Sequence, residues 1–539
     1  MDKELEAEIH PLKHDDKKPR GSLESRTEKD GSFKKASRHS RCAQCRTVFF
    51  FFSLFTCLFV VFIISFIIPC PDRPFSEKLW TVNFNSAVTY DFMAFKDIND
   101  DTVQDVIFLY KDSNSSSSSF NISCTDEGFS SPCAFLAALS GANGSLLWER
   151  PVAQDVVYME CSETQGMNAP PSSCFITGKH NSFLAVDSSI GEILWNQPWD
   201  FGVNVSILSP FLSLPDMAGD GVQDLLLFTK SGREVKSYLY SSSTGDQVGS
   251  MSHLNLEEEV VDYIMHTTNS GAYYIIFLSA SSLYGFSLKE LYEEMTGAKN
   301  IFEEDPQWKK MIDNVTHRMP PLSSGTIRYL ANIPGDTGED ILLVTSTGCE
   351  LFDGQKLRSK WTLNASEVVR KPVLGYYKPG ALALVLENGT DAQRKILIVD
   401  ATSGAILWSH TLSSFAGTPK SATVQTADRR SAFFFWGNSN QTETLYMFHP
   451  TFPDILLELT SITKNIVAFN VLFEQHHHAS YVLLTGPTSQ DWPGPVSLSK
   501  QKVKENILSA QVIWLGQASL ENDQSIKNRF YELRYKRKA

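Results

Sequence analysis

Four stretches of the sequence share one pattern: FLAALSGANGSLLW (135–148), FLAVDSSIGEILW (183–195), SYLYSSSTGDQVG (237–249) and ILIVDATSGAILW (396–408). In each, an apolar run is followed by a polar turn with a glycine and then by a second run, which usually ends in tryptophan. β-branched and aromatic residues favour strands, and the glycine supplies the positive φ of a tight reversal. Each stretch is therefore predicted to be a β-hairpin, and CELFDGQKLRSKW (349–361) is a fifth, weaker copy.

The spacing of the turn glycines predicts how the hairpins are arranged. Gly144, Gly191 and Gly245 lie 47 and 54 residues apart, and Gly354 and Gly404 lie 50 apart. A period of about 50 residues with four strands in each unit is typical of a β-propeller. Hairpins at LYGFSLKELYEEM (283–295) and LYMFHPTFPDILLEL (445–459) fill further periods. Unit ends near 148, 195, 249, 295, 361, 408, 457 and 514 predict an all-β fold of eight blades, with seven as the alternative.

Two further features complete the predicted propeller. KLWTVNF (78–84) precedes the first unit, so a strand there could pair with the last blade and close the ring. The tryptophans at the hairpin ends are expected to pack between blades rather than to bind a ligand. Helix is expected mainly around residues 287–296 and in the apolar segment near the N-terminus.

One apolar segment predicts a membrane anchor. Residues 48–68, VFFFFSLFTCLFVVFIISFII, carry no charge, and a helix of this length is about 32 Å long, enough to cross a bilayer. The basic residues on its N-terminal side remain cytosolic, which predicts a type II signal-anchor protein. A cleaved signal peptide fits less well, because the apolar run is long and PCPDRP offers no small-residue cleavage site. The expected parts are a disordered cytosolic tail (1–47), a transmembrane helix (48–68) and an extracellular propeller (69–539).

Glycosylation motifs and charge agree with this topology. Asn-x-Ser/Thr acceptors occur only after the apolar segment, at Asn114, Asn121, Asn143, Asn204, Asn314, Asn364, Asn388 and Asn440. The chain carries a net charge of −13, and its first 47 residues, with 12 basic and 9 acidic side chains, contribute +3. The remainder is therefore at −16, which argues against nucleic acid as a partner. We expect a plasma-membrane glycoprotein that reaches the cell surface through the secretory pathway.

The cysteines and the tail suggest several modifications. Cys124 with Cys133, and Cys161 with Cys174, have spacings that suit two local disulfides in an oxidising compartment. Cys349 is left over, and is either buried or paired with Cys70. In the tail, Cys42 and Cys45 are candidates for palmitoylation, with an unmodified pair as the alternative, and Ser22, Ser25 and Ser37 are candidates for phosphorylation.

The repeats resemble two known propeller families. VDATSGAILW and VDSSIGEILW resemble the quinoprotein-like repeat, whereas FKDINDDTVQDVIFLY (95–110) and LPDMAGDGVQDLLLF (214–228) resemble the FG-GAP repeat of integrin α-subunits. With the anchor and the IPCPDRP segment, the whole chain resembles the integrin-α FG-GAP-repeat-containing single-pass membrane proteins. This group is the family with sequence similarity two-three-four, and its A branch is the nearest. The resemblance implies a cell-surface membrane protein but no particular activity.

The FG-GAP resemblance implies calcium loops with oxygen ligands at positions 1, 3, 5 and 9. These positions are Asp97, Asn99, Asp101 and Asp105 in the first loop, where Thr102 replaces the usual glycine. The second loop has Asp216, Asp220 and Asp224 with Gly221 in place, and a third keeps only Asp336 and Asp340. We expect structural calcium here; the alternative is that the carboxylates merely cap turns by accepting backbone hydrogen bonds. A quinone is not expected, because that site needs residues from many blades.

No catalytic motif stands out in the sequence. His476, His477 and His478 are adjacent, so in a strand they cannot all face one metal, and a solvent loop is expected. The favoured function is binding or adhesion through the propeller, with an extracellular protein partner and without enzymatic activity. The alternatives are an extracellular enzyme with its site in the propeller channel, and a trafficking or chaperone partner within the secretory pathway.

Overall fold

A computed structural model describes residues 38–67, 76–112, 122–161, 173–179, 182–198, 205–299, 302–322, 325–335, 338–390, 392–414, 417–439, 442–488, 492–516 and 521–537. The predicted sites that lie outside the described residues are Ser22, Ser25, Ser37, Cys70, Asn114, Asn121, Asn204, Asp336 and Asn440. The chain forms two compact units, Met1–Asp72 and Arg73–Ala539.

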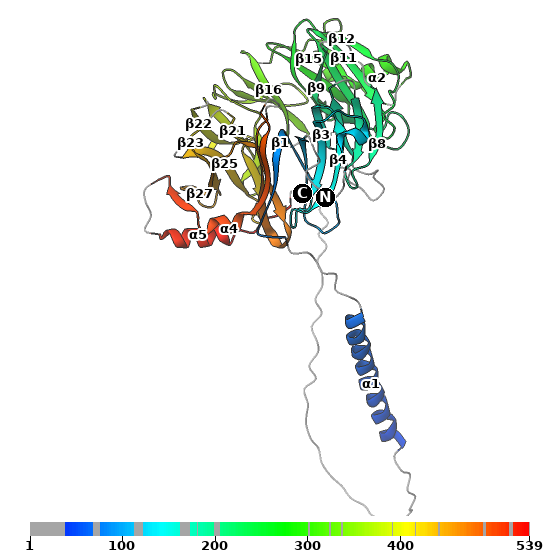
Figure 1. Cartoon of the computed structure of the whole chain (residues 1–539), viewed down its shortest axis with the longest axis vertical. Coiled ribbons are helices and arrows are strands. Elements are labelled where there is room, and N and C mark those ends of the chain that lie inside the picture. The colour runs from blue at the N-terminus through cyan, green and yellow to red at the C-terminus, as the bar shows by residue number, and fades with distance from the viewer. Residues whose placement is uncertain are drawn as a thin grey trace, which may run out of the picture. The chain divides into compact units, whose positions relative to one another are not determined.

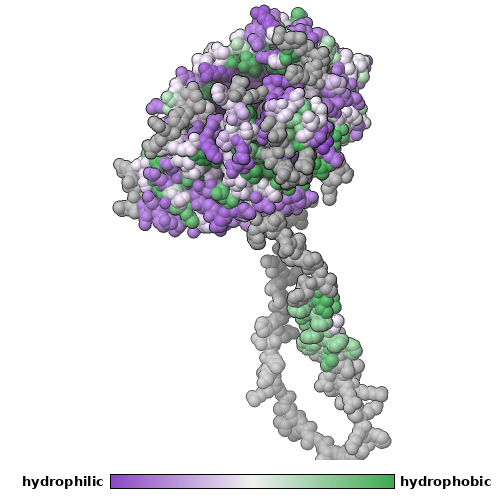
Figure 2. Space-filling view, viewed as in Figure 1, coloured by the Kyte–Doolittle hydropathy of each residue, from purple (hydrophilic) through white to green (hydrophobic). Residues whose placement is uncertain are grey.

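The first unit contains one described helix, α1 (Arg38–Ile67), drawn in blue in Figure 1. The side chains from Val48 to Ile64 are exposed along it, and Figure 2 shows them as a green, hydrophobic surface. Among the described residues, no helix is both long enough and apolar enough to cross a membrane, so the span predicted over residues 48–68 lacks support from the structure.

The second unit consists of antiparallel sheets in which strands that follow one another in the chain pair side by side (Figure 1). One four-stranded sheet consists of β5 (Val156–Cys161), β6 (Ser173–Gly178), β7 (Ser182–Asp187) and β8 (Ile193–Pro198). The next consists of β9 (Ser206–Leu214), β10 (Asp224–Ser231), β11 (Glu234–Tyr240) and β12 (Ser252–Asn255). A third four-stranded sheet consists of β16 (Ile327–Pro334), β17 (Glu339–Thr345), β18 (Cys349–Phe352) and β19 (Ser359–Leu363). A fourth consists of β20 (Val373–Lys378), β21 (Ala381–Gly389), β22 (Gln393–Asp400) and β23 (Ile406–Ser413).

Two further sheets depart from the four-stranded pattern. One has only β13 (Val260–Thr267), β14 (Tyr273–Ser279) and β15 (Leu283–Ser287). The other has five strands: β24 (Ala422–Gln425), β25 (Ser431–Ser439), β26 (Thr442–Phe448), β27 (Ile455–Ile462) and β31 (Gln511–Trp514).

Strand β1 (Leu79–Lys96) links the two ends of the ring of sheets. Its first half, from Leu79 to Ala87, pairs with β30 (Gly494–Lys502), and its second half, from Ala87 to Lys96, pairs with β2 (Asp105–Asp112). It thereby joins β28 (Ile466–Glu474), β29 (His478–Thr485) and β30 to β2, β3 (Cys133–Leu139) and β4 (Leu146–Ala153) in one seven-stranded sheet. The closing strand predicted over residues 78–84 is confirmed.

The hydrophobic core lies between neighbouring sheets and between the two halves of the seven-stranded sheet, which are arranged radially. One cluster packs Ile107 of β2 against Leu184 of β7, and another packs Phe108 of β2 against Val482 of β29. The innermost strands β5, β9, β13 and β16 contact one another in that order, and so do β20, β24, β28 and β1. Radial sheets around a central axis make the second unit a β-propeller, as the repeat predicted.

Tryptophans of several strands pack on the glycine turns of hairpins further along the chain. The turn glycines Gly144, Gly191, Gly245 and Gly404 have φ between 71° and 75°, and they face Trp80, Trp148, Trp195 and Trp361 respectively. A Cβ on any of these glycines would lie only 2.5–2.7 Å from a ring atom. The indole N–H groups of Trp80, Trp195 and Trp361 donate to turn carbonyls at 2.8–3.0 Å. The prediction that these tryptophans pack between blades is confirmed.

The fifth hairpin copy forms, but its turn differs from the prediction. In the Asp400 turn, the N–H of Gly404 donates to the carbonyl of Asp400, and in the fifth copy Leu357 donates to Asp353 in the same way. Leu357 has a φ of 51°, so it occupies the left-handed position that was assigned to Gly354. The carbonyl of Gly354 instead accepts the indole N–H of Trp308 at 3.1 Å.

The predicted hairpin at 283–295 is wrong in its second half. After β15 the chain forms α2 (Leu288–Thr296), in the region where helix was also expected, and then α3 (Pro306–Met311). The amphipathic spacing of Leu288, Leu291 and Met295 buries one face of α2, which favours helix over strand. At the outer edge of β15, Tyr284 forms a short bridge with Arg318.

The C-terminal segment also departs from the predicted last unit. Residues near 514 do not end the last unit of the ring, because β31 adds to the edge of β27 and the first half of β1 takes that place. The helices α4 (Val503–Ile507) and α5 (Asp523–Tyr531) flank this strand in the chain. The backbone N–H of Tyr535 then donates to the carbonyl of His477, which ties the chain end to the ring.

Candidate functional site

A cleft of about 980 Å³ lies in the propeller, lined in large part by the innermost strands of several sheets. Residues 90–95 of β1, 156–161 of β5 and 467–470 of β28 line it, together with residues 369–371 before β20 and 417–420 before β24. Innermost strands line the channel because each sheet turns one edge toward the axis. The cleft therefore combines side chains that are far apart in the sequence.

Glu160 is an acidic group of the cleft that neighbouring residues hold in place. Its Oε2 accepts the phenol of Tyr158 at 3.1 Å and the backbone N–H of Phe211 at 2.9 Å. Burial raises the pKa of Glu160 above its usual range, and the N–H of Phe211 and the Tyr158 phenol partly oppose that shift. Asp91 of β1 adds an exposed carboxylate to the same cleft.

A second acidic group lies just behind the cleft wall. Asp155, which is buried, accepts the phenol of Tyr90 at 2.7 Å and the ammonium of Lys179 at 2.5 Å. Burial and the neighbouring Asp155 carboxylate raise the pKa of Tyr90 far above its ordinary value, so this phenol stays protonated. The network fixes Tyr90 as a hydrogen-bonded wall residue rather than as a base.

The basic groups of the cleft come from the loops before β20 and β24. Arg370 is held at 3.3 Å from Glu387 and donates to the carbonyl of Thr418 at 2.8 Å, so it connects the two loops. Lys371 lies 3.9 Å from Asp262 and is about half exposed. Lys420 is exposed and has no ion-pair partner among the described residues.

Apolar and aromatic side chains separate the charged groups. Phe92 and Met93 of β1 and Phe469 of β28 line the cleft, and Tyr158 packs edge-to-face on Phe211 with ring centroids 4.9 Å apart. Val157 is 51% exposed although it lies on an innermost strand. An exposed apolar side chain inside a cleft indicates a surface that a ligand can cover.

The described lining offers binding groups rather than a recognisable catalytic set. Cys161 is part of a disulfide, and no histidine is among the residues described around the cleft. Within the described ranges, no group of three or more His, Cys, Asp or Glu side chains is placed to hold a metal ion. The cleft can bind through charge, hydrogen bonds and apolar contact.

A smaller cavity of about 280 Å³ lies beside the three-stranded sheet. Lys309 of α3 there contacts Glu304 at 2.7 Å and Glu290 at 3.8 Å. Burial, together with repulsion from Glu304, raises the pKa of Glu290. The sequon residue Asn314 also lines this cavity and is exposed.

The first two predicted calcium loops form similar turns. Asp97 accepts the backbone N–H groups of Asp101 and Thr102 at 3.1 and 2.8 Å, and Asp216 accepts those of Gly219, Asp220 and Gly221 at 2.6–3.2 Å. Thr102 has a φ of 69° where Gly221 has 84°, so the threonine takes up the backbone conformation that suits glycine.

The carboxylate at the ninth position of each loop accepts hydrogen bonds from neighbouring backbone N–H groups. Asp105 accepts the N–H groups of Ile98 and Gly141 at 2.8 and 2.7 Å, and Asp224 accepts that of Met217 at 2.6 Å. Asp340 accepts the N–H of Gly354 and the ammonium of Lys360. These bonds account for the buried carboxylates as turn caps, which was the alternative to calcium, and calcium stays a prediction.

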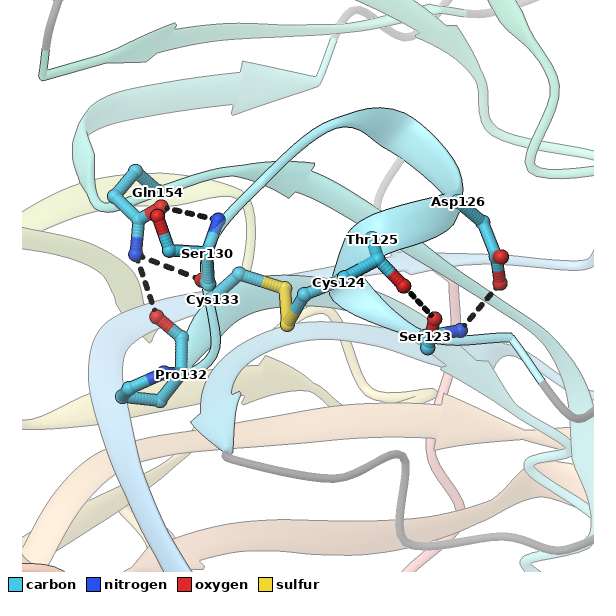
Figure 3. The surroundings of a disulfide bond; sticks show 8 residues. All are labelled: Ser123, Cys124, Thr125, Asp126, Ser130, Pro132, Cys133 and Gln154. Atoms are coloured by element: carbon cyan, nitrogen blue, oxygen red, sulfur yellow. Dashed lines mark hydrogen bonds between the residues drawn. A yellow bond between two sulfur atoms is a disulfide. The ribbon is translucent and has the colours of Figure 1, made fainter.

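Both predicted disulfides are confirmed. Cys124 bonds Cys133, and Cys161 bonds Cys174 across the pair of strands β5 and β6. Figure 3 shows the first bond between η1 (Cys124–Glu127) and the start of β3, where the Gln154 amide donates to the carbonyls of Ser130 and Pro132. Cys349 is free and buried, and burial raises the pKa of its thiol to about 12.

The remaining predicted residues are scattered. Asn364 is exposed, Asn388 lies half-buried on β21, and the Asn143 side chain accepts the N–H of Ser145 at 2.9 Å within its turn. Cys42 and Cys45 fall in α1. His476 and His477 are exposed, in agreement with the expected solvent loop, whereas His478 begins β29 and is half-buried.

Sequence reasoning missed the cleft residues Glu160, Arg370, Lys371 and Lys420. Each stands near the start or end of a strand with no motif around it, and only the ring brings them together. The one available signal was a charged residue beside an otherwise apolar or Gly/Pro-containing segment, as in Gly417-Thr-Pro-Lys420. That signal is common at strand ends and would not have singled them out.

The closed ring of sheets and its axial cleft define the class of protein as a single-chain β-propeller. The chain belongs to the FAM234A/B beta-propeller family, whose model matches residues 80–536. It is similar to Protein FAM234A of Rattus norvegicus, with 51% identity over 99% of both chains. It is also similar to Protein FAM234B of Homo sapiens, with 25% identity over 91% of this chain and 82% of that protein.

Among solved structures, BamB from Moraxella catarrhalis is similar with a TM-score of 0.41 and 13% identity, covering 78% of this chain and 100% of that chain. The family expected from the sequence is confirmed. The relation to integrin-α FG-GAP repeats stays a prediction.

Proposed function

We propose that the propeller is a binding module that receives part of an extracellular partner protein in its axial cleft. The observation that carries this proposal is the cleft itself: about 980 Å³ lined by charged, aromatic and exposed apolar side chains from several sheets. Rigid sheets hold such a surface in place, which lowers the conformational cost of binding. The proposed role is not enzymatic.

The proposed setting is the cell surface, with residues 48–68 as a type II membrane anchor and residues 69–539 outside. The uncharged run at 48–68, the basic residues before it and the sequons after it support this setting. Peptide-N-glycosidase should lower the apparent mass of the full chain, and protease added to intact cells should remove the propeller. A protein without glycans whose C-terminal part is protected would contradict the topology.

We also propose a ring of eight blades with two FG-GAP-like loops that take up structural calcium. The sharing of β1 between two four-strand groups supports this count, since the seven-stranded sheet then represents two blades. The matching turns at Asp97 and Asp216 support the relation between the two loops.

The binding proposal can be tested with a photo-crosslinking amino acid in the full chain on intact cells. Val157 in the cleft is 51% exposed, and Ile406 on the outermost strand β23 is 50% exposed, so the two positions form a matched pair. We expect a discrete crosslinked product from position 157 and none from position 406. No product at 157, or equal products at both positions, would overturn the proposal.

A further inference from the structure

The charged groups of the cleft are divided between opposite walls. Glu160 belongs to β5, whereas Arg370 and Lys371 precede β20. Around the axis, β9, β13 and β16 lie between these strands on one side, and β1, β28 and β24 lie between them on the other. The acidic wall therefore faces the basic wall across the channel.

We infer that the cleft recognises a short polypeptide segment of its partner that carries an acidic side chain at one end and a basic side chain at the other. This inference rests on the proposed binding function and names the chemistry of the partner. The acidic end of the segment would meet the Lys371 and Lys420 wall, and the basic end would meet the Glu160 and Asp91 wall. The apolar middle would cover Phe469 on β28, which lies between β24 and β1, and the neighbouring Phe92 on β1.

On the acidic wall, the carboxylate of Glu160 is held in one orientation in which it can bind a cation. Both hydrogen bonds to Glu160 go to Oε2, from Tyr158 and from Phe211, so the carboxylate is fixed while Oε1 has no hydrogen bond from the described residues. A carboxylate that is already oriented loses little conformational entropy when it binds an ammonium or guanidinium group. Asp91 supplies a second, exposed carboxylate on the neighbouring innermost strand β1.

On the basic wall, Arg370 is held by neighbouring groups, whereas Lys371 and Lys420 can form an ion pair with a partner. Glu387 and the Thr418 carbonyl hold Arg370, which keeps the two loops together. Lys371 has only a long contact of 3.9 Å to Asp262, and Lys420 has no described ion-pair partner. Exposed lysines of this kind can each form an ion pair without first breaking a strong one.

The size and lining of the cleft favour a polypeptide over a single zwitterionic metabolite. The volume of about 980 Å³ is at the upper end of ordinary ligand pockets, which span roughly 300–1,000 Å³. A single amino acid would leave most of the aromatic and apolar lining of the cleft uncovered, including Phe92, Val157 and Phe469. A segment with apolar side chains between its two charges would cover them.

The test uses the full chain in detergent and fluorescent peptide pools of equal length with the same apolar centre. One pool carries Glu and Lys at opposite ends, and the others carry only Glu, only Lys, or neither charge. Binding is measured by fluorescence anisotropy, with a free Glu–Lys dipeptide as competitor. We expect the bipolar pool to bind about tenfold more tightly than either single-charge pool, which corresponds to about 1.4 kcal/mol.

Two variants separate recognition of charge from folding. Glu160→Gln keeps an acceptor for Tyr158 and Phe211 but removes the charge, so the bipolar pool should bind only as well as the Glu pool. Lys420→Gln should reduce the affinity of the bipolar pool to that of the pool that carries only Lys. Glu350 on β18 and Lys395 on β22 lie outside the cleft. Glu350→Gln and Lys395→Gln should therefore leave the preference for the bipolar pool over the single-charge pools unchanged.

Three outcomes would overturn the inference: a neutral pool that binds as well as the bipolar one, control variants that act like the cleft variants, or a dipeptide that competes as well as the peptides. If position 157 still crosslinks to a partner in that case, the binding function stands and only the bipolar recognition fails. Absence of the crosslink would remove the binding function itself.

Discussion

Replacing Gly191 with alanine should weaken the contact through which one sheet supports the next. Gly191 has a φ of 73°, and a Cβ there would lie 2.6 Å from Cε3 of Trp148. Gly380 has the same φ of 73°, but a Cβ there would meet nothing within 4 Å. The two substitutions therefore share the backbone strain and differ in the collision with the indole.

The expected magnitudes follow from these two contributions. A non-glycine residue in the left-handed region costs about 1–2 kcal/mol, and this is all that Gly380→Ala should lose. Gly191→Ala adds the displacement of a buried indole, which costs about 1–3 kcal/mol more, as overpacking of a core typically does. Trp148 is 7% exposed and lies between two sheets, so it has little room to move.

Urea unfolding of the full chain in detergent, followed by tryptophan fluorescence, measures both losses. The combination of Trp148→Leu with Gly191→Ala gives a double-mutant cycle, in which the second substitution should cost less once the indole is gone. Equal losses for Gly191→Ala and Gly380→Ala, or strictly additive losses in the cycle, would refute the packing argument.

Three further predictions concern the same unit. Trp361→Phe should cost about 1 kcal/mol more than Trp148→Phe, because Trp361 Nε1 donates to Ala401 at 2.8 Å whereas Trp148 Nε1 has no described hydrogen bond; denaturant unfolding compares them. Burial raises the pKa of Glu149 to about 7, above its ordinary 4.5, so its contribution to stability is full below pH 4.5 and is lost as the pH rises through 7. Glu149→Gln should flatten the unfolding free energy over that range, and an unchanged slope would contradict this assignment. If calcium occupies the first loop, the melting temperature should be higher in calcium than in chelator, and Asp101→Ala should remove most of the shift whereas Asp336→Ala should not; equal melting temperatures would leave the loops as turns only.

The sequence predicted those features that depend on neighbouring residues. The turn at Gly404 and the strands beside it are local, so the hairpin and its period could be read directly. The disulfide between Cys124 and Cys133 was predictable because the two cysteines are only nine positions apart in the sequence. The closing strand was predictable because an apolar segment without a hairpin partner preceded the first unit.

The sequence did not predict features that tertiary packing decides. Residues 288–296 were expected both as part of a hairpin and as helix, and the burial of Leu288 and Leu291 against the sheets selects helix. Leu357 adopts a conformation that usually marks glycine, because the turn is held by the hydrogen bond to Asp353. The walls of the cleft depend on which strands lie opposite each other, and no local pattern encodes that.

Ring closure and the cleft depend on the same strand. The first half of β1 pairs with β30, and residues 90–95 in its second half line the cleft. Ala87, where the strand changes partner, pairs with both Gly494 and Asp112. Trp80 fixes the first half, since its indole packs on Gly144 and donates to the carbonyl of Gly141, which also accepts Lys500 at 2.8 Å. The same continuous strand closes the ring and lines the cleft. The position of Phe92 in the cleft therefore depends on the pairing between β1 and β30.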